Sequence, residues 1–271
     1  MLLVYLVPVA NTLFGAFIGY AGPDAGRFVG LGNFQKIEST IAPTVLRTLV
    51  WTFGSVVPAI VLGLALASLF QHQFLLKKLV MSLCLLPYAI PLIIVASCWM
   101  FMYNQDFGLI NVFLRKVGLV KESIQFLSFK SAMGSVIVVR AWRAMPFAFV
   151  NYYAAMSTIP GEQYEAADVD GASGLQKFRY ITLPNLRSIT SMTLIILTVW
   201  TFLVFDIIYG MTGGGPIDVT NIISIQIYRE LTNMRDFGTA AAWSLTAMIV
   251  LALISVLYWR LFPLGDTREK A

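Results

Sequence analysis

Few side chains in this sequence have the type and spacing that catalysis, metal binding or nucleotide binding requires. The single histidine, His72, has no cysteine or carboxylate near it in the chain. Cys84 and Cys98 lie 14 residues apart in one apolar run, which separates them by about 21 Å along a helix and puts a disulfide out of reach. The stretch from Gly171 to Lys177 only approximates the phosphate-binding motif G-x-x-x-x-G-K-[ST], with the wrong spacing. We therefore expect no catalytic site, metal or bound cofactor in this chain.

The remaining candidates are polar side chains within or at the ends of apolar runs. Ionisable groups in lipid are costly and are functional candidates by default. Arg140 and Arg143 are three residues apart and so share one helical face. Two interpretations stay open: Arg143 pairs with Asp206 or snorkels to hold helices together, or the polar groups line a solute pathway. The candidate pathway residues are Arg47, Arg140, Arg143, Asn151, Tyr152 and Asp206.

The composition places these apolar runs in a membrane. Of the 271 residues, 58% are hydrophobic and 12% are charged, against roughly half and a quarter in soluble proteins. The mean hydropathy of +0.76 leaves too little polar surface to cover a soluble domain. The net charge of +5 comes from charges scattered among apolar runs. Since no basic patch with interleaved aromatic residues occurs, we expect no nucleic-acid partner.

The apolar runs predict an all-α, polytopic membrane protein, with residues 1–271 forming one transmembrane domain. A helix of about 20 residues crosses the hydrocarbon core, and the alternating pattern of a membrane barrel is absent. Prolines inside the runs predict kinks at Pro58, Pro87, Pro91 and Pro146. The six predicted spans are 2–20, 48–70, 79–103, 132–156, 185–209 and 240–261.

The charges of the connecting segments give a weak indication of topology. Segments 71–78, 157–187 and 260–271 carry 8 Lys or Arg in 51 residues, whereas 21–43, 104–130 and 210–238 carry 8 in 79. This bias favours a cytoplasmic location for the first set. The first run has no basic segment before it and no clear cleavage site, so we expect a span and not a removable signal peptide.

The hydrophilic segment 160–184 has the local features of two short helices. Pro160 ends the preceding span, and Glu162 and Glu165 fall in the first turns of a helix, where the helix dipole favours negative charge. Gly171 after Asp170 can adopt the left-handed conformation that ends such a helix. We expect a second helix from about residue 173 to 180, and Pro184 then opens the fifth span. The segment thus predicts a compact helical knob outside the membrane.

The spacing of residues in this knob resembles the EAA signature of permease subunits from binding-protein-dependent ABC importers. The match is Glu165-Ala166-Ala167, Gly171, Ile181 and Leu183-Pro184. Other segments resemble the sugar-type branch of that family, and the resemblance covers nearly all of residues 29–262. These segments are Val29 to Phe34, Leu86 to Pro91 with Trp99, Trp142-Arg143 with Pro146, Phe205-Asp206, and the extracytoplasmic loop with Gly213, Gly214, Gly215, Pro216 and Thr220.

The resemblance implies a role for the knob. In that family the EAA loop is cytoplasmic and docks on a separate ATPase subunit, which binds ATP and Mg²⁺. Small residues permit close approach, and Glu165 offers a carboxylate to a basic residue of the partner. The residues implied in this coupling are Glu165, Ala166, Ala167, Asp170, Gly171, Ala172, Leu183 and Pro184.

The resemblance also implies the setting and the partners. The chain is expected in the cytoplasmic membrane of a bacterium or archaeon, with the C-terminus cytoplasmic. The implied partners are a second, homologous permease, two ATP-binding subunits and an extracytoplasmic solute-binding protein, although a homodimeric permease stays possible. Pro8 aligns with a proline midway along the family's first helix, so either that helix is short or its first part is missing here.

The transported solute is left open between two classes. A neutral sugar is the default for the family. Arg140 and Arg47 depart from the residues expected at their positions, and two extra buried arginines favour an anionic sugar derivative held by guanidinium groups. The rival from another class is a stand-alone ion-coupled transporter, which favours internal repeats and paired acidic residues in the spans. Only Asp206 is available for that role.

Overall fold

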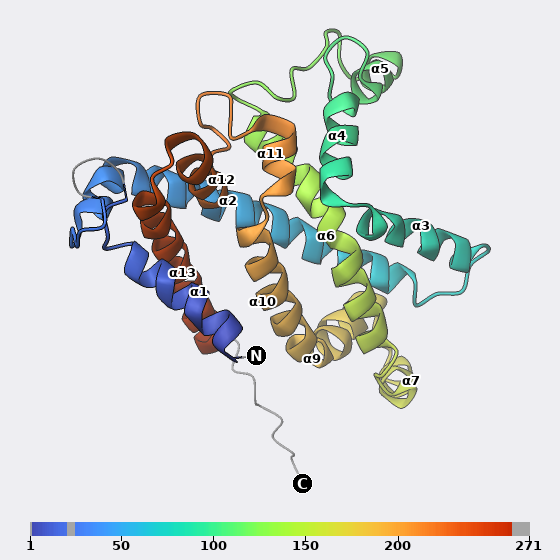
Figure 1. The fold of residues 1–271 in the computed structure, drawn as a ribbon. Coiled ribbons are helices and arrows are strands. Elements are labelled where there is room, and N and C mark those ends of the chain that lie inside the picture. Colours follow the sequence, from blue (N-terminus) through green and yellow to red (C-terminus); the bar gives the residue numbers. More distant parts are fainter. Residues whose placement is uncertain (1, 21–24, 262–271) are drawn as a thin grey trace. The chain divides into compact units, whose positions relative to one another are not determined.

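The computed structural model describes residues 2–20 and 25–261 (Figure 1). In this part of the chain the regular structure is helical, apart from two isolated bridges that pair Ile18 with Phe28 and Gly19 with Ala25. The all-α class is therefore confirmed. The predicted cytoplasmic C-terminus beyond residue 261 lies outside the described residues. The chain divides into two compact units, which are described separately below.

Unit 1 comprises Met1–Thr52, Leu92–Ile137 and Phe202–Ile254. Within this unit α4 packs closely against α11, where a Cβ on Gly210 would lie 2.7 Å from the Cβ of Ala96. The helices that lie in this unit wholly or in part are α1 (Leu2–Gly15), α2 (Gly32–Leu69), α4 (Leu92–Met102), α5 (Leu109–Lys116), α6 (Ala132–Met156), α10 (Arg187–Leu203), α11 (Asp206–Thr212), α12 (Ile223–Arg229), the π-helix η3 (Glu230–Met234) and α13 (Phe237–Leu261).

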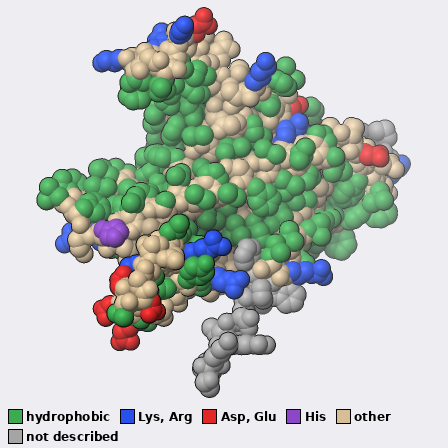
Figure 2. Space-filling model, turned by 180° about the vertical axis from the view of Figure 1, so that it is seen from behind, with side chains coloured by type: hydrophobic (Ala, Val, Ile, Leu, Met, Phe, Trp, Pro, Cys, Tyr) green, Lys and Arg blue, Asp and Glu red, His purple; other side chains and the backbone are tan. Residues whose placement is uncertain are grey.

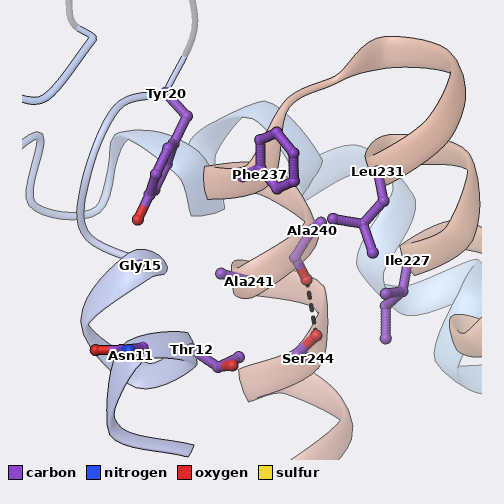
Figure 3. Close-up of a pocket in the computed structure, with 10 residues that line it drawn as sticks. All are labelled: Asn11, Thr12, Gly15, Tyr20, Ile227, Leu231, Phe237, Ala240, Ala241 and Ser244. Atoms are coloured by element: carbon purple, nitrogen blue, oxygen red, sulfur yellow. Dashed lines mark hydrogen bonds between the residues drawn. The ribbon is translucent and has the colours of Figure 1, made fainter. Parts of the chain in front are cut away.

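Small residues allow α1 and α13 to approach closely within unit 1. A Cβ on Gly15 would lie 3.5 Å from the Cβ of Ala241, the kind of close approach that small residues allow between membrane helices. Figure 3 shows a pocket of about 270 Å³ at this contact, where the Ser244 hydroxyl donates to the Ala240 carbonyl at 2.9 Å. Tyr20 and Phe237 close one end of it, with their ring centroids 6.0 Å apart.

Unit 2 comprises Phe53–Pro91, Val138–Thr201 and Ser255–Ala271. Its core packs α2 against α6 so closely that a Cβ on Gly63 would lie 2.6 Å from the Cβ of Ala148. Phe70 and Phe149 meet edge to face in this core, with ring centroids 5.1 Å apart. Besides parts of α2, α6, α10 and α13, the unit contains α3 (Lys77–Ala89), α7 (Gly161–Val169), α8 (Gly174–Lys177), the π-helix η2 (Phe178–Thr182) and α9 (Leu183–Asn185).

Several helices have the length and apolar character of membrane spans. Among the described residues, α2, α6 and α13 each suffice alone, and two interrupted pairs, α3 with α4 and residues 174–185 with α10, reach that length together. The described apolar part of α1 is shorter, Leu6–Gly15. Large hydrophobic side chains cover most of the face in Figure 2, as expected of a surface that contacts lipid. The prediction of six spans therefore stays a prediction.

The helix is interrupted within two of the predicted spans, which themselves stay predictions. Within 79–103 the helix stops after Ala89 and resumes at Leu92, because Ile90 precedes Pro91 and is extended at φ −81° and ψ 132°. Within 185–209, α10 ends at Leu203 and α11 begins at Asp206. The other three prolines predicted to kink helices, Pro58, Pro87 and Pro146, lie inside α2, α3 and α6.

Helix α2 begins at Gly32, 16 residues before the predicted span 48–70, and this span coincides with the second half of the helix. Its first turns carry the polar residues Asn33, Gln35 and Lys36, so the hydropathy pattern does not indicate this part of the helix. The buried side chain of Asn33 donates to the carbonyls of Ala16 and Ile18 at 3.0 and 2.9 Å. These bonds fix the start of α2 against the segment that follows α1.

Candidate coupling loop and solute pathway

The coupling loop, residues 160–184, turns between α7 and α8 at Gly171. The φ of Gly171 is +74°, and its N–H donates to the Asp168 carbonyl at 3.1 Å, while the Ala172 N–H donates to the Ala167 carbonyl at 2.9 Å. This pair of bonds is the Schellman arrangement, which ends a helix on a left-handed residue. Asp170 is the last residue before that turn, as predicted. The conformation thus explains why glycine stands at position 171.

The second half of the loop begins with a capping box. The Ser173 N–H donates to the Gln176 side chain at 2.7 Å, and the Gln176 N–H donates to the Ser173 hydroxyl at 3.4 Å. The predicted helix from 173 to 180 is α8, which continues as the π-helix η2 and then α9. Pro184 lies in α9, whereas α10 begins at Arg187.

Side chains tie the two halves of the loop together. The hydroxyls of Tyr164 and Thr182 are 2.9 Å apart, and the Lys177 ammonium pairs with Asp168 at 2.6 Å. The Asp168 side chain is 60% exposed, so this ion pair contributes little to stability. The arrangement holds α7 beside η2 as one small body at the end of α6 (Figure 1).

The outer surface of the loop combines acidic and apolar groups. Glu162, Glu165 and Asp170 are exposed, and among the predicted coupling residues Ala166, Gly171, Leu183 and Pro184 are exposed while Ala167 and Ala172 are half-buried. Val169 is 88% exposed and Leu175 is 76% exposed. Sequence reasoning missed these two residues, although a large apolar residue in a hydrophilic segment is a usable signal. Such a surface suits a partner with an apolar cleft and basic groups.

A pocket of about 540 Å³ opens beside the loop within unit 2. It lies between the end of α2 and the helices η2 and α8. Part of its polar lining comes from side chains that already bond within the loop, Tyr164, Thr182 and Lys177. The other lining residues are Ser68, Gln71, His72, Met156, Gly174 and Phe178.

Arg140 is buried inside unit 2. Its side chain is on α6 with 5% of the residue exposed, and its Nε and Nη2 donate to the Thr201 hydroxyl at 3.1 and 2.9 Å. Thr201 is on α10, so the bonds join two helices of the predicted spans. A neutral hydroxyl does not compensate the charge of a buried guanidinium.

Arg143 lies one turn further along α6. Its guanidinium carbon is 4.6 Å from the centre of the Tyr88 ring, a cation–π contact. Its buried Nε has no hydrogen-bond partner among the described residues. The two arginines and Tyr88 therefore form a positively charged cluster, the arginine cluster, with donor capacity to spare.

The other pathway candidates in unit 2 have more ordinary surroundings. Asn151 donates to the Phe147 carbonyl of its own helix at 3.0 Å. Tyr152 is fully buried in the core with Phe70 and Phe149. These contacts do not include the residues of the arginine cluster. The role of Asn151 and Tyr152 in the pathway stays a prediction.

Arg47 and Asp206 fall in unit 1. The Arg47 Nε donates to the Asn221 carbonyl at 3.1 Å, and its Nη2 donates to the Thr44 hydroxyl at 3.1 Å. Asp206 is exposed at the first position of α11. Since Arg143 belongs to the other unit, the predicted pairing of Arg143 with Asp206 stays a prediction.

The glycine loop, residues 213–220, is held by side chains around its backbone. Gly213 and Gly214 have φ of +57° and +92°. The Thr220 hydroxyl donates to the Gly215 carbonyl at 2.8 Å and lies 2.7 Å from the Thr212 hydroxyl. Pro216 follows Gly215 through a cis peptide bond.

Arg229 closes the glycine loop from α12. Its guanidinium donates to the Gly213 carbonyl at 2.9 Å and pairs with Asp218 at 2.5 Å. Ile217, which precedes Asp218 in the chain, is 85% exposed. Its φ of +46° is unusual for a β-branched residue. The loop is thus a fixed structure that presents an apolar side chain.

The fold and these sites define a class: an all-helical membrane protein with a compact helical loop and a charged cluster among its apolar helices. The profile of one family, "Binding-protein-dependent transport system inner membrane component", matches residues 59–262. The chain belongs to this family, whose members are the membrane permeases of ABC importers.

Relatives agree with this assignment over most of the chain. The trehalose/maltose transport system permease protein MalF of Thermococcus litoralis is 32% identical over 234 residues, which cover 85% of this chain and 78% of that protein. The sn-glycerol-3-phosphate transport system permease protein UgpA of Escherichia coli O157:H7 is 30% identical over 239 residues, which cover 87% and 80%.

Solved structures share the fold. A bacterial ABC transporter involved in the import of the acidic polysaccharide alginate has a chain that matches with a TM-score of 0.82 and 23% identity, covering 96% of this chain and 90% of that one. The MetNI methionine ABC transporter gives a TM-score of 0.58 with 20% identity, covering 84% and 97%.

Proposed function

We propose that this chain is the permease subunit of an ABC importer for a sugar or sugar derivative, and that a separate ATPase subunit drives it by docking on the coupling loop. The observation that carries the docking role is the loop surface, where Val169 and Leu175 stand exposed beside the carboxylates of Glu162 and Glu165. Relatives named for trehalose, maltose and glycerol-3-phosphate support the solute class.

Docking of this loop converts a motion of the ATPase into a motion of the permease. Because Gly171 and the capping box fix the two short helices as one body, a displacement of the loop passes to α6 and α10, between which it lies in the chain. ATP-driven closure of the ATPase subunits then shifts the balance between inward-open and outward-open arrangements. Energy comes from the partner, and this chain supplies the pathway.

Extraction in mild detergent tests the docking role. Tagged wild-type protein is expected to carry an ATPase subunit, a second permease and, on crosslinking, an extracytoplasmic solute-binding protein. Glu165→Lys and Val169→Asp are expected to lose the ATPase subunit at least tenfold, because each places the wrong group in the docking surface. Exposed residues elsewhere provide matched controls, Glu122→Lys and Leu75→Asp.

The same experiment separates this function from its rival. A wild-type chain that purifies alone and still transports when reconstituted is a stand-alone carrier, driven by an ion gradient. If both loop variants retain the ATPase subunit, the loop is not the docking site. The assignment of the chain to its family does not depend on this result. The number of different permease chains recovered decides between a heterodimer and a homodimer.

The arginine cluster supports a second, narrower proposal, that the solute is anionic. Arg140 is buried with one neutral partner, and Arg143 keeps an unused donor. A carboxylate, phosphate or sulfonate on the solute would supply the missing charge and pair with the planar guanidinium. Relatives at similar identity are named for both neutral and anionic solutes, so identity alone leaves the charge undecided.

Transport of a matched pair of solutes tests this proposal. The pair is a disaccharide and its uronic-acid or phosphate analogue, offered to wild type and to Arg140→Gln. An anionic pathway predicts that wild type prefers the charged analogue and that Arg140→Gln loses this preference about tenfold or more. Equal uptake of both analogues by both proteins contradicts it. Arg115→Gln, at an exposed arginine outside the candidate pathway, is the matched control.

A further inference from the structure

The predicted fifth span is interrupted without a helix-breaking residue. No glycine or proline occurs between Val199 and Asp206, yet α10 ends at Leu203 and Val204 and Phe205 are not helical. At membrane depth, non-helical backbone is tolerated only where protein buries it or water reaches it. The Ser224 hydroxyl satisfies one freed acceptor, the Val204 carbonyl, at 3.3 Å.

The residue after the interruption indicates that water reaches this place. Asp206 is exposed at the first position of α11. An exposed carboxylate in a membrane segment faces a water-filled cavity and not lipid. Both the interruption and the carboxylate therefore point to an aqueous surface on this side of unit 1.

Three aromatic rings gather at the interruption and form an aromatic platform, defined as Phe205, Tyr209 and Tyr228. The ring centroids of Phe205 and Tyr209 are 4.7 Å apart with 22° between their planes. Tyr228 lies 4.9 Å from each of the other two rings. The hydroxyls of Tyr209 and Tyr228 are 3.3 Å apart. Tyr209 is 44% exposed, and the other two rings are half-buried.

The platform is held rigidly from behind. α11 turns Ile207, Ile208 and Met211 into the protein, and its Gly210 leaves no room for a side chain against Ala96 of α4. The opposite side of α11 carries Asp206 and Tyr209, which are exposed. Rings that are fixed before a ligand arrives lose little entropy when it binds.

We propose that the aromatic platform binds the pyranose ring of the transported solute, an inference that rests on the proposed function of sugar import. The C–H face of a sugar ring carries partial positive charge and stacks on the negative face of an aromatic ring. The two tyrosine hydroxyls can bond to sugar hydroxyls, and so can the exposed carboxylate of Asp206, which precedes Tyr209 by three residues on α11. An apolar surface with a few convergent polar groups is the usual composition of a small-molecule site.

Saturation-transfer NMR on the assembled transporter in nanodiscs tests the proposal. The probes are the methyl α-glycosides of glucose, galactose, mannose and glucuronic acid, with sn-glycerol 3-phosphate as a probe that has no ring. We expect transfer from aromatic protons to the C–H protons of at least one glycoside. Tyr209→Leu is expected to weaken its apparent affinity about fivefold to tenfold, and Tyr209→Trp is expected to retain it.

The matched control is Tyr20→Leu. Tyr20 is also in unit 1, is 46% exposed and has a ring partner, Phe237, at 6.0 Å. This variant should bind the glycosides as wild type does.

Three results would overturn the proposal: no transfer to any of the four glycosides, equal affinity of wild type and Tyr209→Leu, or a second permease that dissociates from Tyr209→Leu. The last result would mean that the rings pack at a subunit interface. In each case recovery of the ATPase subunit with wild type shows that the proposed function stands while this inference fails. Absence of the ATPase would instead reject the proposed function.

Discussion

The coupling loop and the glycine loop are both polar turns rich in small residues, but different contacts hold them. In the coupling loop the backbone caps itself around Gly171, whose added Cβ would meet nothing within 4 Å. In the glycine loop, side chains fill the space around the backbone, and a Cβ on Gly214 would lie 2.8 Å from Arg229 Nη2. In the coupling loop glycine is needed for its positive φ alone. In the glycine loop Gly214 is needed also because its neighbours leave no room for a side chain.

The largest effect is expected for Gly171→Asp. Aspartate adopts the left-handed conformation less readily than glycine, and its charge at the C-terminal end of α7 is unfavourable to the helix dipole. We therefore expect the corner between α7 and α8 to open and the proposed docking surface to move. We expect uptake and recovery of the ATPase subunit to fall at least tenfold.

Gly174→Asp is the matched control, because Gly174 also has open space around it but has no positive φ and starts α8, where negative charge is favourable. Normal uptake by Gly171→Asp would contradict the view that backbone conformation fixes the coupling loop.

The next effect is expected for Gly214→Ala. Its Cβ meets Arg229 Nη2 at 2.8 Å and Ile225 Cγ2 at 2.9 Å, and Arg229 is pinned by Gly213 and Asp218. We expect thermal unfolding to show a loss of about 1–3 kcal/mol, as for other overpacked sites. Gly213→Ala, with open space, should lose less. If removing the side chain in Gly214→Ala/Arg229→Ala rescues nothing, the clash is not the cause.

A smaller effect of opposite sign is expected for Ile217→Asn. Asparagine tolerates the left-handed conformation better than a β-branched residue, and the side chain is 85% exposed, so little packing is lost. Thermal stability should stay the same or rise by up to about 1 kcal/mol. A clear loss of stability would show that Ile217 packs in the assembled importer. Titration with the solute-binding protein then tests whether Ile217 contacts it.

The smallest effect concerns acid stability at the start of α13. Burial raises the pKa of Asp236, but the Lys36 ammonium at 2.7 Å and two hydrogen bonds from Thr239 outweigh it and hold the pKa below 3.8. A lowered carboxyl pKa adds stability above the unfolded value, and this stability is lost as the pH falls through the folded value. Wild type should therefore lose stability below about pH 4, and Asp236→Asn should lose less over that range.

The coupling loop was predictable because its determinants are local. Pro160, Gly171 and Ser173 act on their own turns, and the structure has α7, the left-handed corner and the capping box where they indicate. Val169 and Leu175 lie outside the signature, and their exposure of 88% and 76% depends on how the short helices pack, which the spacing of residues does not specify.

The interruptions and the arginine contacts were not predictable in the same way. The break before Asp206 is accompanied by a hydrogen bond from Ser224 to the Val204 carbonyl and by the close approach of Gly210 to Ala96, contacts between residues distant in sequence. The partner of Arg140, Thr201, is 61 residues away. Hydropathy shows that such residues lie in apolar helices, but it cannot show which of them meet.

The coupling loop is stabilised by contacts within its own residues, so we expect it to keep its structure when transferred to another permease. Its backbone bonds around Gly171, its capping box and its Tyr164–Thr182 contact all lie inside residues 160–184. A chimaera that carries this stretch in another permease should keep the shape of the loop and bring its ATPase preference with it. Under the proposed function, recognition of the ATPase and recognition of the solute would depend on different parts of one chain and could diverge separately in evolution.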